Sequence, residues 1–386
     1  MKISNWLAAT AGMALMAGAA WAQESGEGAA EDTAAAEGGM AQADLDALYA
    51  AAQEEGMLTT VALPHDWCNY GAMFEGFKAK YPGIEVNELN PNASSAEELE
   101  AIRANMNNAG PQAPDVIDVG LAFGPQAKEE GLIQPYMVST WDSIPEDAKD
   151  SEGYWYGDYY GVMSFSVNTD LVDPVPQSFA DLLKPEYAGQ VALAGDPRAS
   201  NQAILGVLAA GMAQGAEAGQ AAGEAGLQFF KELNDAGNFV PVIGGSGTLA
   251  QGTTPIIIQW DYNALSTRDT LAGNPPVEVV VPSDATLAGV YVQAISAYAP
   301  HPNAAKLWME YLYSDEGQTH WLSGYCHPIR FDDMVERGVV PQELLDKLPP
   351  AESYAGAVFP TLEQIEANRA AVVEGWDTVV GADVVE

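Results

Sequence analysis

The sequence predicts an α/β protein built from about two domains. Its 386 residues exceed the size of one ordinary core, and apolar residues make up 48% of the chain. Short apolar runs alternate with amphipathic stretches, and the first series, over residues 58–119, has the order strand, helix, strand, helix, strand. That order predicts a mostly parallel sheet with helices on both faces, in which ligands bind at the carboxyl ends of the strands.

The elements of this first series follow from apolar periodicity and from its breaks. Pro64 ends the first strand. Ser94 or Ser95 caps the second helix. The first turn of that helix carries Glu97 and Glu98, where the helix dipole favours anions. We expect strands at 58–63, 84–89 and 116–119, and helices at 71–81 and from 94 or 95 to 107.

A second series of strands and helices follows Tyr160. Three consecutive isoleucines within residues 254–259 indicate a buried strand, because a strand covered on both faces reads as a continuous apolar run. We expect strands at 162–167, 190–194, 240–243, 254–259, 277–281 and 289–296, helices at 178–183, from 201, at 229–238 and at 303–313, and a helical final stretch of about 60 residues.

The charge balance excludes several classes of partner. Lys and Arg number 15 against 54 Asp and Glu, which gives a net charge of −39. Nucleic acids and anionic membranes are poor partners for such a surface, and like-charge repulsion favours a monomer. Nine Trp, sixteen Tyr and ten Phe supply the buried area that disordered chains lack.

The first residues predict export. Residues 1–22 read as a secretory signal, with Lys2, an apolar run of about 15 residues and a small-residue site that places cleavage after Ala22. The alternative is a membrane anchor, but the run is short for a spanning helix of about 20 residues. Residues 23–43 lack aromatic residues and predict a flexible acidic leader, so the folded part is expected to begin near residue 44.

The two cysteines, Cys68 and Cys326, favour a disulfide in an exported protein. Such a bond ties the start of the folded chain to its last third. The alternative is two separate buried thiols. Two Cys and four scattered His give no spacing typical of a metal site, so we expect no bound metal and no cofactor.

Three segments resemble one known family. The first is the strand-like stretch 156–171, followed by the Phe-Ala-Asp-Leu of residues 179–182. The second is 297–317, where Pro-Asn-Ala leads into Ser-Asp-Glu-Gly, and the third is 324–330, with Gly, Pro and Ile. Together they are similar to the extracellular solute-binding proteins of ATP-driven importers, in the branch of polyamine, ferric-ion, phosphonate and related binders. The similarity runs in order over nearly all of residues 44–386.

The resemblance implies a two-lobe, type II periplasmic-binding-protein fold with the ligand between lobes joined by crossing strands. The chain is then expected to cross near Tyr160, Gly289 and Gly324. The resemblance also implies a periplasmic location, hinge closure around the solute and a membrane permease as partner. The expected boundaries are 44–160 plus 290–324 for lobe one and 161–289 plus 325–386 for lobe two.

Rings and carboxylates follow two predicted strands. Trp260, Asp261 and Tyr262 come after the isoleucine strand. Asp66 and Trp67 come after the first strand. Ring faces beside carboxylates suit a cation or a hydroxylated ligand. The ferric-binding relatives carry two adjacent Tyr near residue 261, so Asp261 makes ferric binding doubtful. The alternatives are a core Trp260 and an exposed turn at Asp66.

A helix start offers the opposite chemistry. Arg198, Ser200 and Asn201 stand where a predicted strand turns into a helix, and such starts bind anions. The alternative for Arg198 is a surface salt bridge.

Five more residues lie at the predicted crossings and are candidates to face the ligand. Packing of the hinge is the alternative for them. They are Tyr159, Tyr160, Tyr291, Tyr325 and His327.

The sequence therefore favours a non-enzymatic binding protein for a small organic solute. An amine-bearing or zwitterionic solute satisfies both ends of the candidate site, a polyamine comes next, and a sugar or polyol follows. A chemoreceptor ligand-sensing protein remains open. A secreted hydrolase with Asp66 and Asp261 as paired carboxylates is the enzymatic alternative, although no catalytic motif supports it.

Overall fold

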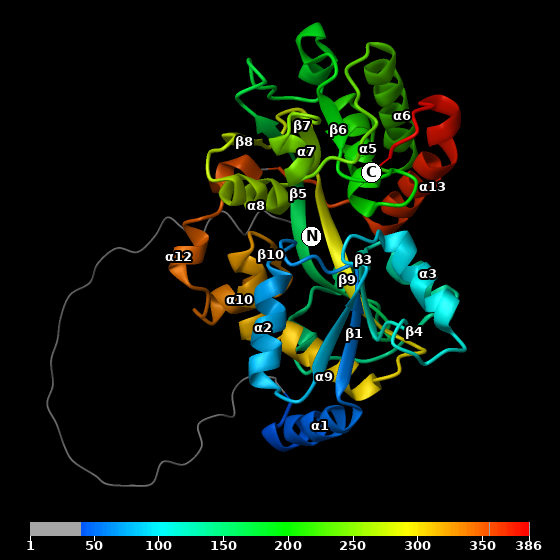
Figure 1. The fold of residues 1–386 in the computed structure, drawn as a ribbon, viewed down its shortest axis with the longest axis vertical. Helices are drawn as coiled ribbons and strands as arrows, with labels where there is room; N and C mark the ends of the chain where they lie inside the picture. Colours follow the sequence, from blue (N-terminus) through cyan, green and yellow to red (C-terminus); the bar gives the residue numbers. More distant parts are fainter. Residues whose placement is uncertain (1–39, 355, 386) are drawn as a thin grey trace, which may run out of the picture.

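The computed structural model describes residues 40–354 and 356–385, so the predicted signal and most of the predicted leader lie outside the described residues. These residues form two α/β lobes, one above the other in Figure 1. No helix within the described part of the chain has both the length and the apolar character needed to span a membrane.

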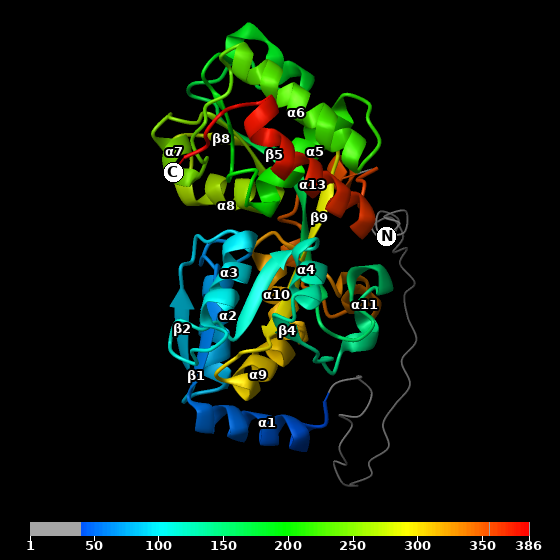
Figure 2. The same cartoon turned by 90° about the vertical axis from the view of Figure 1, so that its right-hand side faces the viewer.

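The lower lobe contains the first α/β series, and its elements match the sequence prediction closely. Ser94 caps α3 in a capping box with Glu97. The lobe is completed by helices from residues 302–323 (Figure 2). Its elements are α1 (Gln42–Glu55), β1 (Met57–Val61), α2 (Tyr70–Lys80), β2 (Glu85–Leu89), α3 (Ser95–Asn105), β3 (Val116–Gly120), α4 (Phe123–Glu129), β4 (Ile133–Gln134), α9 (Pro302–Leu312) and α10 (Asp315–Ser323).

The upper lobe is built around a short sheet flanked by α5, α6 and α13 (Figure 2). Its elements are β6 (Val191–Leu193), α5 (Asn201–Ala213), α6 (Gln220–Asp235), α7 (Ser246–Ala250), β7 (Ile256–Trp260), α8 (Asp261–Leu271), β8 (Val277–Val280) and α13 (Leu362–Val379). Between the lobes and around them lie β10 (His327–Pro328), α11 (Phe331–Glu336) and α12 (Gln342–Leu345).

Two long strands, β5 (Tyr156–Asn168) and β9 (Ala288–Ser296), run from one lobe into the other (Figure 1). The larger sheet has the order β3-β9-β5-β7-β6, and β5 pairs antiparallel with β7, β8, β9 and β10. Only the pairs β1–β2 and β6–β7 are parallel among the described strands. The α/β two-lobe fold is therefore confirmed, but the prediction of a mostly parallel sheet is wrong, because the crossing strands run against their neighbours.

Two local predictions also differ from the structure. Residues 240–243, expected to form a strand, contribute only an isolated bridge from Val242 to Val385. A second isolated bridge, from Val191 to Phe239, lies just before them. The helix expected at 229–238 begins earlier, at Gln220 in α6, because its alanines and glycines pack closely against α5. The added Cβ of an alanine at Gly226 would lie 2.0 Å from the carbonyl oxygen of Val207, so only glycine permits this contact.

The predicted disulfide between Cys68 and Cys326 is confirmed, with a Cα–Cα distance of 5.4 Å. It joins the loop after β1 to the segment before β10, over 258 residues of sequence. The backbone of Gly324 lies against this loop so closely that a Cβ there would come within 2.6 Å of the amide nitrogen of Asn69. The loop that carries Trp67 is thus fixed to the third connection between the lobes.

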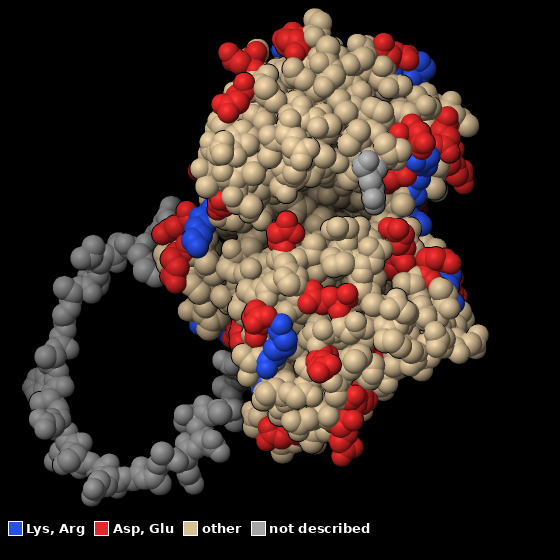
Figure 3. All heavy atoms as spheres, in the orientation of Figure 1, with Lys and Arg blue, Asp and Glu red and all other residues tan. Residues whose placement is uncertain are grey.

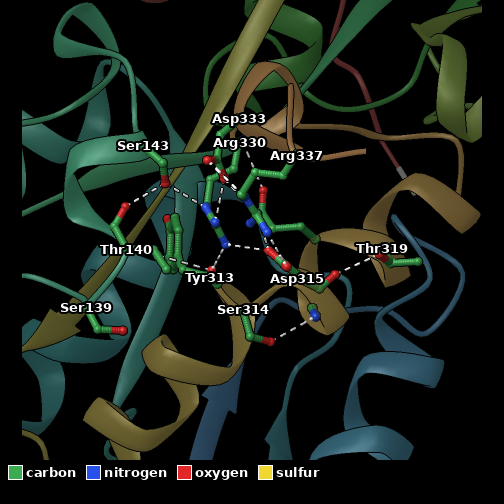
Figure 4. Close-up of polar contacts among 12 residues, drawn as sticks. Ser139, Thr140, Ser143, Tyr313, Ser314, Asp315, Thr319, Arg330, Asp333 and Arg337 are labelled. Atoms are coloured by element: carbon green, nitrogen blue, oxygen red, sulfur yellow. Dashed lines mark hydrogen bonds and ion pairs between the residues drawn. The ribbon is translucent and has the colours of Figure 1, made fainter. Parts of the chain in front are cut away.

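A buried arginine fixes the segment after β10 to the lower lobe (Figure 4). The Arg330 side chain is 5% exposed, and it donates to Ser143 Oγ at 2.6 Å, to the carbonyl oxygen of Tyr313 and to Asp333 at 2.6 Å. Its guanidinium also lies 3.3 Å from Asp315. Arg330 therefore joins α11 to α10 and to the turn around residue 143.

Candidate functional site

A cavity of about 710 Å³ lies between the lobes, where strand ends and helix starts from both lobes meet. Figure 3 shows the surface hollowed between the upper and lower lobes. The lower lobe contributes the loop after β1, the start of α3 and the end of β3. The upper lobe contributes the starts of α5, α7 and α8. Both lobes thus face the same space, as hinge closure around a ligand requires.

Aromatic rings form part of the lower wall. Trp67 Nε1 donates to the hydroxyl of Tyr159 at 2.7 Å, and the Trp67 ring meets Tyr262 and Tyr291 edge-on. Tyr159 stacks on Tyr291 with ring centroids 5.5 Å apart. Only Trp67 and Tyr291 of these four rings line the cavity, and Tyr159 and Tyr262 lie behind them.

Three buried carboxyl groups, Glu98, Asp118 and Asp158, lie at the inner wall and form what we call the acid cluster. Glu98 and Asp118 line the cavity, while Asp158 lies one layer deeper. Glu98 accepts the backbone N–H of Asp118 at 2.9 Å. Asp118 accepts the hydroxyls of Tyr70 at 2.8 Å and Tyr159 at 2.7 Å.

Burial raises the pKa of every member of the acid cluster. Desolvation raises the pKa of Asp118 to about 6, against the lowering effect of the Tyr159 and Tyr70 hydroxyls. Desolvation and the charge of Asp118 raise the pKa values of Asp158 and Glu98 well above the ordinary range. The charge of Asp118 is the second cause, after desolvation, of the raised pKa of Asp158, so the two carboxyl groups titrate as a coupled pair.

The start of α5 faces the acid cluster from the upper lobe. Asn201 is 3% exposed, lines the cavity, and its Nδ2 has no hydrogen-bond partner among the described residues. Its amide lies against Gly120, two residues beyond Asp118 in β3: a Cβ added to Gly120 would lie 2.0 Å from Asn201 Cγ. Ser200, the residue before the helix, also lines the cavity and its side chain caps no backbone N–H.

Arg198, predicted to bind an anion, does not line the cavity. It contacts Asp196 at 2.8 Å, Asp377 at 3.1 Å and Asp383 at 3.0 Å. The hydrogen bonds that the guanidinium donates to Asp196 and Asp383 raise its pKa. The charge of Arg198 is therefore balanced by carboxylates, of which Asp196 also lines the cavity, as in the surface salt bridge that was its alternative.

Trp260, Asp261 and Tyr262 are fully buried and do not line the cavity. Asp261 Oδ1 accepts the backbone N–H of Val162 at 2.8 Å, and Oδ2 accepts the hydroxyl of Tyr354 at 2.8 Å. Its carboxylate thus holds β5 and the C-terminal segment. Since Asp261 does not face Asp66 across the cavity, the paired carboxylates of the hydrolase alternative are not present in this arrangement.

The remaining predicted residues lie at the connections between lobes. Tyr160 stacks on His327 with ring centroids 4.7 Å apart, and the hydroxyl of Tyr325 donates to Asp269 on α8. The structure thus brings only part of the predicted site to the cavity. The predicted residues that line it are Asp66, Trp67, Ser200, Asn201 and Tyr291, and those that do not are Tyr159, Tyr160, Arg198, Trp260, Asp261, Tyr262, Tyr325 and His327.

Sequence reasoning missed other residues that line the cavity. Asp118 carried a usable signal, because it is a lone charge within the buried strand Val-Ile-Asp-Val-Gly. The position of Glu98 was misleading, because a glutamate in the first turn of a helix is already explained by its favourable interaction with the helix dipole. The polar side chains of Gln202, Gln259 and Asn263 gave no signal, because nothing in their local pattern distinguishes them.

The chemistry of the cavity is one-sided. The described residues that line it include five carboxylates and neither Lys, Arg nor His; the carboxylates are Asp66, Glu97, Glu98, Asp118 and Asp196, the last of which is paired with Arg198. Among the described residues, no group of three or more His, Cys, Asp or Glu is arranged to hold a metal ion. The cavity therefore offers carboxylates, amides, hydroxyls and ring faces to a ligand.

Comparisons with solved structures agree with this architecture. The periplasmic binding protein AfuA from Actinobacillus pleuropneumoniae, solved with fructose-6-phosphate bound, is 21% identical at a TM-score of 0.66, covering 84% of this chain and 98% of its own. AgtB from Agrobacterium tumefaciens R10, solved with agropinic acid, is 17% identical at a TM-score of 0.65, covering 84% and 99%. At such identities the likeness shows the two-lobe fold.

Sequence comparisons give the family. An uncharacterized protein of Haemophilus influenzae is 32% identical over 249 residues, or 60% of this chain and 66% of that protein. The probable ABC transporter periplasmic-binding protein y4fP of Sinorhizobium fredii is 35% identical over 118 residues, or 29% and 31%. The matches thus span less than two thirds of these relatives. The family model of the bacterial extracellular solute-binding proteins matches residues 112–352, more than half of the chain, and the chain belongs to that family.

Proposed function

We propose that this protein is the periplasmic solute-binding component of an ABC importer, and that it captures a small organic solute bearing an amine between its lobes. The observation that carries the proposal is that two buried carboxyl groups, Glu98 and Asp118, line the cavity, whereas none of the described residues that line it is cationic. A buried carboxylate without a cation is costly, and a ligand ammonium group removes that cost.

The capture step is supported by contacts across the cavity. Ser266 on α8 lies 3.4 Å from the carbonyl oxygen of Asp66, and Asn201 packs on Gly120. On the other side, the Arg369 guanidinium of α13 lies 4.1 Å above the ring of Phe123 on α4. Such contacts exist only when the lobes are together, so a solute that bridges the lobes selects this state. A permease that recognises the closed state completes delivery.

The rest of the solute is expected to be polar. Neutral amides and hydroxyls line the cavity around Gln202, Gln259 and Thr267, and Trp67 and Tyr291 supply ring faces. The start of α5 at Ser200 suits a carboxylate or another acceptor. A zwitterion with its ammonium toward the acid cluster uses both ends. A neutral sugar or polyol uses only the rings and amides, and it is the second candidate.

A thermal-shift screen of matched compounds tests the proposal, because a bound ligand raises the melting temperature by mass action. We expect 1,4-diaminobutane, 4-aminobutanoate or glucosamine to raise it more than 1,4-butanediol, butanoate or glucose. Each pair differs in its amine. Trp67→Ala should reduce the shift, whereas Trp141→Ala, far from the cavity lining, should not. Equal shifts from glucose and glucosamine would favour the sugar candidate instead.

A further inference from the structure

The acid cluster is more than a source of negative charge, because its members are connected to one another and to the cavity. Gln293 on β9 donates to Tyr70 at 2.8 Å and to Asp158 at 3.0 Å, and Tyr70 donates in turn to Asp118. On the cavity side, Trp67 donates to Tyr159, which donates to Asp118. Asp118 is therefore the point where a ring that lines the cavity meets the buried carboxyl pair.

Two observations show that the cluster lacks a partner. Within the part of the chain that the structure describes, no Lys, Arg or His lines the cavity beside Glu98 and Asp118. Asn201 faces the same region from the upper lobe with a buried, unpartnered Nδ2 among the described residues. An unsatisfied donor beside unneutralised acceptors is the arrangement expected where a ligand carrying both kinds of group completes the hydrogen bonding.

We propose that Glu98 and Asp118, with Asp158 behind them, bind the cationic group of the solute at the inner wall of the cavity, and that the cluster releases a proton to solvent when the solute binds. This inference rests on the proposed function and names the part of the cavity that selects the amine. In the binding step a carboxyl O–H bond breaks, its proton goes to water or buffer, and the new carboxylate is stabilised by the incoming ammonium.

The surroundings of the cluster favour this step. The groups that face it are acidic, phenolic or neutral, so no neighbouring cation competes with the ammonium; they are Tyr70 on α2, Glu97 on α3, Tyr159 on β5, Gln293 and Tyr291 on β9, Tyr262 on α8 and Tyr313 after α9. Desolvation raises the pKa values of Glu98 and Asp158 well above their ordinary range, which favours the protonated form that the proposed release requires.

Calorimetry of the purified protein with 1,4-diaminobutane, at pH 7.5 in phosphate and in Tris, tests the inference. The two buffers differ in ionisation enthalpy, so proton release appears as a difference in the observed binding enthalpy. We expect about one proton to be released for each molecule of 1,4-diaminobutane bound. Kd should then rise about tenfold for each unit by which the pH is lowered from 7.5 to 5.5. 1,4-Butanediol should neither bind at this wall nor release a proton.

Two variants and a control assign the proton. Asp158→Asn imitates the protonated acid, since its amide can donate to Asp118, and Glu98→Gln imitates the second protonated carboxyl. The double variant should bind 1,4-diaminobutane without proton release. Asp115→Asn removes another buried carboxyl, directly before β3, one that contacts His301 and Thr59 away from the cavity, and should leave release unchanged. An infrared band from protonated carboxyl groups should be present in wild type and reduced by the amine.

The outcomes separate the two proposals. If 1,4-diaminobutane binds with the same enthalpy in both buffers, the cluster keeps its protonation state and this inference is wrong, while the proposed function stands. If no amine binds and glucose does, both fail. If the infrared band is absent from the unliganded protein at pH 7.5, the cluster is fully ionised and has no proton to release. The inference is then wrong, whichever ligand the protein binds.

Discussion

Arg330 offers a direct test of what fixes the C-terminal segment to the lower lobe. Replacing it by alanine removes a 95% buried guanidinium and its bonds to Ser143, to the Tyr313 carbonyl and to Asp333 (Figure 4). Removing one partner of a buried ion pair costs about 3–5 kcal/mol, because the other groups are left buried without partners.

A neighbouring arginine moderates the expected loss. Arg337 contacts both Asp315, at 2.6 Å, and Asp333, at 2.9 Å, so these carboxylates keep a cation when Arg330 is absent. The groups that lose a donor are then Ser143 and the Tyr313 carbonyl, which keeps the hydroxyl of Thr140 at 3.1 Å. We therefore expect Arg330→Ala to lower the free energy of unfolding by about 3 kcal/mol, at the low end of the range for buried pairs.

Chemical and thermal denaturation measure this change. A loss of about 3 kcal/mol should lower the melting temperature by about 4 °C. The control is Arg268→Ala, which removes a 41% exposed arginine paired with Asp269 and should cost less than about 1 kcal/mol. If the two variants unfold at the same temperature, the Arg330 contacts do not hold this segment and the reasoning fails.

Three further predictions follow from the same contacts. Reducing the Cys68–Cys326 bond, or replacing both residues by Ser, should cost about 2–5 kcal/mol in denaturation experiments, because the bond closes a loop of 258 residues; unchanged stability would contradict this. Gly120→Ala should weaken solute binding with little loss of melting temperature, since its Cβ would displace Asn201 only when the lobes are closed; calorimetry that gives wild-type affinity would oppose this. Burial raises the pKa of Asp118 to about 6, so the contribution of Asp118 to stability falls as the pH rises from about 4 to about 6. Asp118→Asn should therefore make the melting temperature depend less on pH over that range. An unchanged dependence would exclude Asp118 as its cause.

Much of the fold could be predicted because local pattern determines local structure. The apolar runs and helix caps of residues 58–119 located every strand and helix of that series within a few residues. Strand direction was not predictable in the same way. The periodicity of β5 says that it is a strand, but its antiparallel pairing with β7 and β9 depends on connections that leave and re-enter each lobe.

The cavity was predicted less well because side-chain direction depends on distant glycines. Trp260 and Tyr262 follow a strand end, where a ligand site is expected, yet both rings turn onto the crossing strands. A Cβ at Gly289 would lie 2.3 Å from the Trp260 ring, and one at Gly161 would lie 2.4 Å from the Tyr262 ring. Those two glycines, 29 and 101 residues away from the rings that cover them, make room for Trp260 and Tyr262 in the core. With these rings buried, the cavity wall is left to Trp67 and Tyr291, and the inner wall to the acid cluster.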